Sequence, residues 1–190
     1  MPTPAFFRNY GQVIGAAHMC LDKDLHMPAL VLVFTLIDSF AWAISKKAKK
    51  ATRETFEAWA QSLVIPNGQL SCTATELYAA RCGVLHTLTS KADLHSVKGV
   101  RQVVYSWGPT KLDTLQKSIA VVNSEGFVGL HINELLEAVK GAIAKTFEAA
   151  KNDSQLQSRL QDAALLHFSE MPASSLEKVL QLHSSGLTLP

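Results

Sequence analysis

Arginine and histidine, two residue types suited to chemistry on a phosphate group, lie close together at Arg81 and His86, with four residues between them. Histidine changes its protonation state near neutral pH, so it can accept or donate a proton. Arginine keeps its charge and presents a fork of donors to the oxygens of a phosphate or phosphorane. The segment that carries this pair is therefore the candidate for a site that acts on a phosphate.

A capping-box pattern predicts the start of that segment. Thr73 and Glu76 have the spacing in which a side-chain hydroxyl and a carboxylate each bond the other residue's backbone N–H. The apolar periodicity that follows predicts a helix over 73–88. Arg81 falls in the apolar sector of this helix, and a guanidinium is costly to bury without a partner. It must meet a carboxylate, line a cleft or bind an anion, and Asp38 is the candidate partner.

His86 lies about 140° from Arg81 on an ideal helix, among the small residues Ala79, Cys82 and Gly83. This small face predicts close approach of a second helix, which a symmetric partner could supply. A straight helix would not aim both side chains at one phosphate. We therefore expect a catalytic pair to require a distortion near Gly83, an early end of the helix, or a site shared by two subunits.

Each residue also has a purely structural interpretation. Arg81 could form a buried ion pair with Asp38 or Glu76, and His86 could be an ordinary interface or helix-end histidine. Glu76 is favoured as a cap over an acid, whereas Asp38 serves equally well as structural partner or as orienting group. Cys82 beside Arg81 is a support residue in these hypotheses, with a redox role as the minor alternative.

Periodicity and turn residues predict a mainly α-helical bundle with a small β-hairpin insertion. The core is expected over about 28–150, followed by C-terminal helices over about 152–184, in one domain spanning 1–190. The helices are expected at 9–21, 28–45, 53–64, 73–88, 112–120, 133–150, 156–168 and 174–182, and the strands at 100–107 and 127–132. Pro66-Asn67-Gly68 is expected to stop the third helix, and Asn133 to cap the sixth.

Composition narrows the class of protein. The chain has 190 residues, 47% of them hydrophobic, and a net charge of +2, which is typical of a globular protein and does not by itself predict nucleic-acid binding. Its three cysteines have no disulfide or zinc-ligand spacing, so we expect a reducing, cytoplasmic compartment and no structural metal site. No cofactor is expected. The apolar run 28–44 contains Asp38 and is interpreted as a buried helix rather than a membrane span.

A basic run follows that apolar segment. It is expected to be a solvated helix end, and RNA binding is the weaker alternative. Its members are Lys46, Lys47, Lys49, Lys50 and Arg53.

The run Glu76-Leu77-Tyr78-Ala79-Ala80-Arg81-Cys82-Gly83-Val84-Leu85-His86 resembles the HEPN superfamily, whose motif is an arginine, four to six residues and a histidine on a late helix. The resemblance is to a small bacterial and plasmid-borne branch and covers about residues 28–150. It implies a helical homodimer that acts as a metal-independent endoribonuclease. Arg81 would bind the scissile phosphate, His86 would act as general base or acid, and the products would carry a 2′,3′-cyclic phosphate and a 5′-hydroxyl.

Two positions depart from the family pattern. Cys82 stands where many members have asparagine, aspartate or histidine, and Leu88 stands where the toxin branch paired with nucleotidyltransferases has tyrosine. The resemblance implies a role in bacterial stress or in phage and plasmid defence, with an RNA substrate and an antitoxin or other protein partner. The alternatives are a non-catalytic module that binds RNA, a nucleotide or a protein, and a structural dimer in which Arg81 is architectural.

Overall fold

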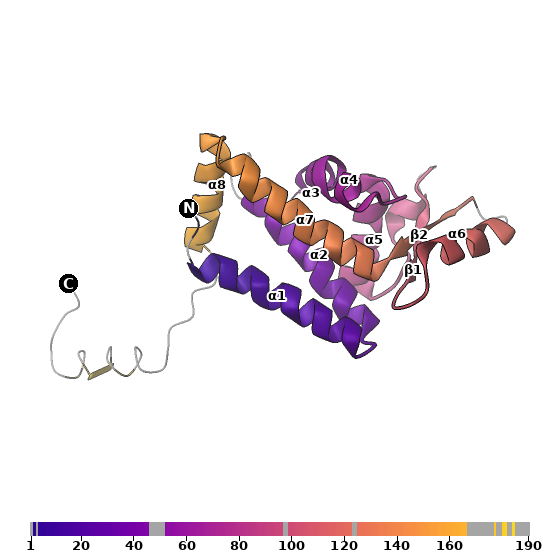
Figure 1. The fold of residues 1–190 in the computed structure, drawn as a ribbon, viewed down its shortest axis with the longest axis horizontal. Helices are drawn as coiled ribbons and strands as arrows, with labels where there is room; N and C mark the ends of the chain where they lie inside the picture. The colour runs from indigo at the N-terminus through magenta and orange to yellow at the C-terminus, as the bar shows by residue number, and fades with distance from the viewer. Residues whose placement is uncertain are drawn as a thin grey trace.

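The computed structural model describes residues 2, 4–45, 52–96, 99–122, 125–166, 177, 180, 181 and 184. As predicted, the protein is mainly helical (Figure 1). The elements are α1 (Pro4–Asp22), α2 (His26–Ala43), α3 (Arg53–Trp59), the π-helical turn η1 (Ala60–Val64), α4 (Ile65–Gly68), α5 (Ala74–Thr87), the 3₁₀ turn η2 (Asp93–Ser96), β1 (Gln102–Ser106), α6 (Leu112–Val121), β2 (Phe127–His131), α7 (Ile132–Ala150) and α8 (Ser154–Leu166).

Helix α2 is the central helix of the core, as its apolar run predicts. It packs against α1, α3, α5 and α7, and Figure 1 shows α1 and α7 running beside it. Val33, Phe34, Ile37 and Phe40 are fully buried. Among the described helices, α2 alone is long and apolar enough to cross a membrane, but half of its residues are buried inside the protein. A core helix meets the same criteria of length and composition.

Helix α1 begins at Pro4, five residues before the predicted start. Proline is favoured in the first turn of a helix because it has no N–H to leave unpaired there. The extra turn buries Phe6, whose ring lies 4.8 Å from the ring of Tyr10 and 6.2 Å from that of Phe147, measured between centroids. Aromatic packing onto α7 therefore accompanies the earlier start of the helix.

The predicted stop at Pro66-Asn67-Gly68 is wrong, because the chain stays helical through Gly68. The π-helical turn η1 precedes Pro66, and proline occupies the first turn of α4, where no N–H is needed. Asn67 donates a hydrogen bond from Nδ2 to the Ala138 carbonyl at 3.1 Å. Contact with α7 thus uses residues whose types are usually found in turns.

The β-hairpin prediction is also wrong. Strands β1 and β2 pair in parallel, in a register from Gln102 opposite Phe127 to Ser106 opposite His131. A parallel pair requires a crossover connection, which α6 supplies. Helix α6 packs on β2 where Gly129 has no side chain, since a Cβ there would lie 3.1 Å from Leu115. The two strands were correctly placed in the sequence, but the helix between them reverses the expected orientation.

The starts of α7 and α8 also differ from prediction. Asn133 does not cap α7: His131 holds the cap position, and Asn133 Oδ1 instead accepts a hydrogen bond from the Gly108 N–H at 3.3 Å. Helix α8 begins at Ser154 because Asp153 Oδ1 accepts from the Leu156 N–H at 2.9 Å. The last predicted helix, 174–182, lies mostly outside the described residues.

Candidate functional site

The capping box predicted for α5 is present. Thr73 Oγ1 accepts from the Glu76 N–H at 3.2 Å, and Glu76 Oε2 accepts from the Thr73 N–H at 2.8 Å. The helix ends at Thr87, after which Leu88 adopts a left-handed conformation with φ of 53°. These two ends place Arg81 in the middle of α5 and His86 in its exposed last turn.

Arg81 forms the ion pair predicted with Asp38 of α2. Its Nε lies 2.7 Å and its Nη2 2.6 Å from the same carboxylate oxygen, Oδ2. The two side chains are only 19% and 20% exposed. Burial alone would lower the pKa of Arg81, but the hydrogen bond and charge of Asp38 outweigh it and raise that pKa. The guanidinium is therefore a fixed cation, oriented by a carboxylate from another helix.

Arg81 and His86 also meet within one chain. Arg81 Nη1 lies 3.0 Å from His86 Nε2, although α5 is continuous from Ala74 to Thr87. The expectation that a straight helix would keep these two side chains apart is wrong. The angle of about 140° describes the directions of the two side chains at Cα, whereas the long arginine side chain reaches around the last turn of the helix.

The contact sets the hydrogen-bond roles of the two side chains. A guanidinium donates hydrogen bonds and cannot accept them. His86 Nε2 is therefore the acceptor in this contact, which corresponds to the tautomer with its proton on Nδ1. An imidazole with a lone pair on Nε2 is the form that a general base requires.

The donors of Arg81 are largely occupied. Nε and one Nη2 proton serve Asp38, and Nη1 contacts His86 and, at 3.9 Å, the Cys82 sulfur. On its inner side the guanidinium borders a hollow of about 30 Å³, also lined by Asp38 and Tyr78, which suits a water molecule and not a phosphate. An anion that approaches Arg81 from the exposed His86 side would compete with His86 for the Nη1 donor.

Tyr78, which the sequence did not single out as a site residue, lies between two arginines. The guanidinium carbons of Arg81 and Arg53 lie 5.8 and 5.7 Å from its ring centroid. Burial, the charge of Cys82 and a hydrogen bond with it raise the pKa of the Tyr78 hydroxyl. The spacing of three residues between Tyr78 and Arg81 is the signal that could have identified this contact.

Glu76 belongs to a different cluster. It is 2% exposed, and besides capping Thr73 it accepts hydrogen bonds from Arg101 Nε at 2.6 Å and Nη2 at 3.1 Å. Burial opposes ionisation of Glu76, but the hydrogen bonds from Arg101 and Thr73 prevail and lower its pKa. The residue joins the start of α5 to the segment that leads into β1, and within the described part of the chain it bonds Thr73 and Arg101 rather than Arg81.

The small-residue face of α5 is covered by the chain itself. A Cβ on Gly83 would lie 2.6 Å from the Thr89 carbonyl oxygen and 3.2 Å from that of Lys91, and Ala79 is fully buried. The prediction that a second helix would cover Gly83 is therefore wrong, because the segment after α5 folds back over it.

The basic run is described only at its end. Lys46, Lys47, Lys49 and Lys50 lie outside the described residues. Arg53 donates from Nε to Glu57 at 2.8 Å and contacts the Tyr78 ring. It is thus the member of the run that the structure places beside the Arg81 cluster.

No group of three or more histidine, cysteine or acidic side chains is arranged to bind a metal ion within the part of the chain that the structure describes. The chain matches no protein-family model, no curated protein and no solved structure. The site is therefore interpreted from its own geometry.

Proposed function

We propose that the protein is a metal-independent endoribonuclease of the HEPN type, a cytoplasmic homodimer that acts in bacterial stress or in phage and plasmid defence. The observation that carries the proposal is the 3.0 Å contact between Arg81 Nη1 and His86 Nε2 at the exposed end of α5. It joins a fixed cation and an imidazole at a surface that a phosphodiester can reach.

The proposed reaction begins when a phosphate oxygen takes the Nη1 donor of Arg81. This frees the Nε2 lone pair of His86, which accepts the proton of the ribose 2′-hydroxyl. The 2′-oxygen then attacks phosphorus, and Arg81 stabilises the negative charge that develops on the phosphate oxygens. The bond from phosphorus to the 5′-oxygen breaks, and the leaving oxygen takes a proton. The products carry a 2′,3′-cyclic phosphate and a 5′-hydroxyl.

Asp38 acts in this proposal as a positioning residue. It fixes the guanidinium through Nε and Nη2 and leaves Nη1 directed toward His86. Arg53, beside Tyr78, extends the positive charge around the site. From their charge alone, Lys46, Lys47, Lys49 and Lys50 remain the weaker RNA-binding candidates of the proposal.

In the proposed dimer, the partner subunit supplies the general acid that a single site lacks. Transesterification needs one group to take the 2′-proton and another to protonate the 5′-oxygen, and the cluster contains a single histidine. A second His86 from a partner subunit would provide the acid. A protein antitoxin that covers the exposed end of α5 would block the same step.

The test is cleavage of a structured RNA in EDTA by the wild-type protein, with mass spectrometry of the product ends. We expect 2′,3′-cyclic phosphate termini, and a loss of at least about 100-fold in rate for His86→Ala and for Arg81→Lys. His18→Ala, a partly exposed histidine on α1, is the matched control and should keep the wild-type rate. Cleavage that does not depend on His86 would overturn the proposal.

The second candidate is a non-catalytic module that binds RNA, a nucleotide or a protein partner. It is favoured by the occupied donors of Arg81 and by the weakly hydrogen-bonding Cys82 in the following position. RNA binding that requires Arg81, without any cleavage that requires His86, would select this candidate. RNA cleavage with the expected ends would exclude it.

A further inference from the structure

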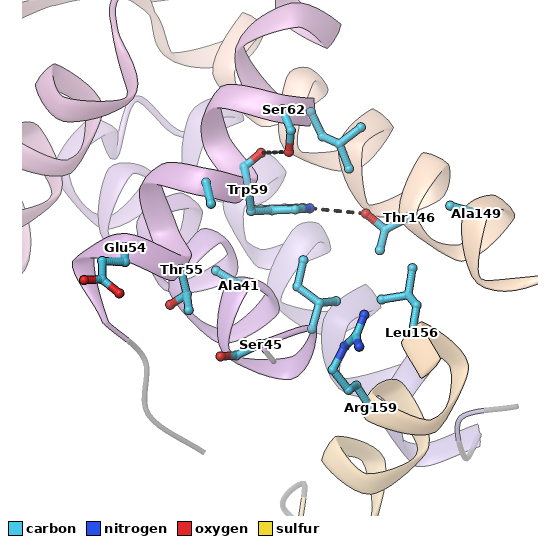
Figure 2. Close-up of a pocket in the computed structure, with 13 residues that line it drawn as sticks. Ala41, Ser45, Glu54, Thr55, Trp59, Ser62, Thr146, Ala149, Leu156 and Arg159 are labelled. Atoms are coloured by element: carbon cyan, nitrogen blue, oxygen red, sulfur yellow. Dashed lines mark hydrogen bonds between the residues drawn. The ribbon is translucent and has the colours of Figure 1, made fainter. Parts of the chain in front are cut away.

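A separate cavity of about 470 Å³ lies between the end of α2, helix α3, η1, the end of α7 and helix α8 (Figure 2). Its size is in the range of small-molecule sites. The walls are mainly apolar, with Ile44, Trp59, Leu63 and Leu156 among the lining residues. An apolar cavity of this size at the junction of five elements can accept the body of an organic ligand.

Most buried polar atoms in the wall already have partners. Trp59 donates from Nε1 to Thr146 Oγ1 at 3.2 Å, and Thr146 donates to the Ala142 carbonyl at 2.8 Å. Figure 2 shows the indole and the threonine directed at each other across the wall. The hydrogen bonds of Trp59 and Thr146 are therefore satisfied within the protein, and neither group needs a ligand.

Arg159 is the exception. Its Nε is buried and has no hydrogen-bond partner in the part of the chain that the structure describes. In Figure 2 the side chain reaches from α8 toward the cavity, away from Glu54 at the opposite side. A guanidinium donor that is buried without an acceptor is unfavourable, and an anionic oxygen would satisfy it.

We propose that this cavity binds an amphipathic monocarboxylate, with its apolar body against Trp59 and Leu63 and its carboxylate on Arg159. One arginine matches one negative charge, so a monocarboxylate suits the lining better than a dianion such as a phosphate monoester. The cavity is distinct from the Arg81 site, although Ala41 and Thr55 line both hollows. The inference does not rest on ribonuclease activity.

The experiment is isothermal titration of the full-length protein with decanoate, and with decanol as a neutral ligand of the same chain length. We expect decanoate to bind at least about 10-fold more tightly than decanol, since a charge-assisted hydrogen bond is gained. Arg159→Gln should weaken decanoate binding by a similar factor and leave decanol binding unchanged. Lys151→Gln, which removes an exposed cation near the same end of α7, is the matched control and should have no effect.

Two further variants keep the result interpretable. Arg159→Lys keeps the charge and should retain most of the preference for decanoate if Arg159→Gln impairs folding. Ala149→Phe places a ring at the rim of the cavity and should weaken both ligands. Absence of decanoate binding, equal binding of decanol, or decanoate binding that ignores Arg159→Gln would each overturn the proposal.

Discussion

One carboxylate oxygen of Asp38 accepts hydrogen bonds from two nitrogen atoms of Arg81, Nε at 2.7 Å and Nη2 at 2.6 Å. This arrangement links the central helix α2 to α5 and leaves Nη1 of the guanidinium for His86. The same ion pair therefore contributes to the stability of the core and to the orientation of the proposed catalytic group.

Asp38→Asn should lower the free energy of unfolding by about 2 kcal/mol, because it leaves the mostly buried Arg81 without a charged partner. Urea unfolding measures the change, with Asp162→Asn on the exposed face of α8 as control. The variant should also reduce RNA cleavage, because Arg81 is no longer fixed toward His86. A change in stability no larger than that of Asp162→Asn would show that the pair does not stabilise the fold.

Glu76→Gln should destabilise the protein by about 2–3 kcal/mol at neutral pH, since it removes a buried carboxylate that binds Arg101 and caps α5. Glu134→Gln, also in the first turn of a helix but exposed, is the matched control. It should cost only a few tenths of a kcal/mol through the helix dipole. Equal effects of the two substitutions would contradict the buried role of Glu76.

The acid dependence of stability should change in the same variant. Because the pKa of Glu76 is lowered on folding from an ordinary value of 4.5, its carboxylate stabilises the protein above that value. The contribution is lost as the pH falls through the lowered pKa. Urea unfolding from neutral pH down to about pH 3 should show a loss of stability in the wild type that is smaller in Glu76→Gln. Parallel curves for the two proteins would contradict the lowered pKa.

Local signals predicted α5 well, because both partners of its capping box, Thr73 and Glu76, lie within one turn. Asp38 was identified as the partner of Arg81 by charge alone, since it is the one acidic residue in an apolar helix. The features that the sequence did not predict depend on contacts between segments that are far apart in the chain. The parallel sheet follows from the packing of α6 on Gly129, and the helix through Pro66 follows from contacts with α7.

The Arg81–His86 contact was missed for a different reason. Helical periodicity describes the direction of Cα–Cβ bonds, whereas the guanidinium lies several rotatable bonds beyond them. Its position is set by Asp38, which belongs to another helix. A prediction from one helix alone therefore failed, even though the two residues and their helix were correctly identified.

Gly83→Ala should destabilise the protein by about 1–3 kcal/mol. The added Cβ would lie 2.6 Å from the Thr89 backbone oxygen, which cannot move without shifting the segment that covers α5. Gly15→Ala in α1 is the matched control, because nothing lies within 4 Å of its added Cβ. It should stabilise the protein by about 0.5–1 kcal/mol through helix propensity. Thermal unfolding compares the two, and stabilisation by both would show that the Thr89 segment does not pack on Gly83.

Cys72 should resist alkylation in the folded protein. It is 3% exposed, and burial together with the neighbouring Glu76 carboxylate raises the pKa of its thiol to about 12. Iodoacetamide reacts with the thiolate, which would be about one part in ten thousand at pH 8. Peptide mass spectrometry after brief treatment should find Cys20 modified and Cys72 unmodified, with Cys72 reacting only after unfolding in urea. Modification of Cys72 in the native protein at the rate of the unfolded chain would contradict its burial beside Glu76.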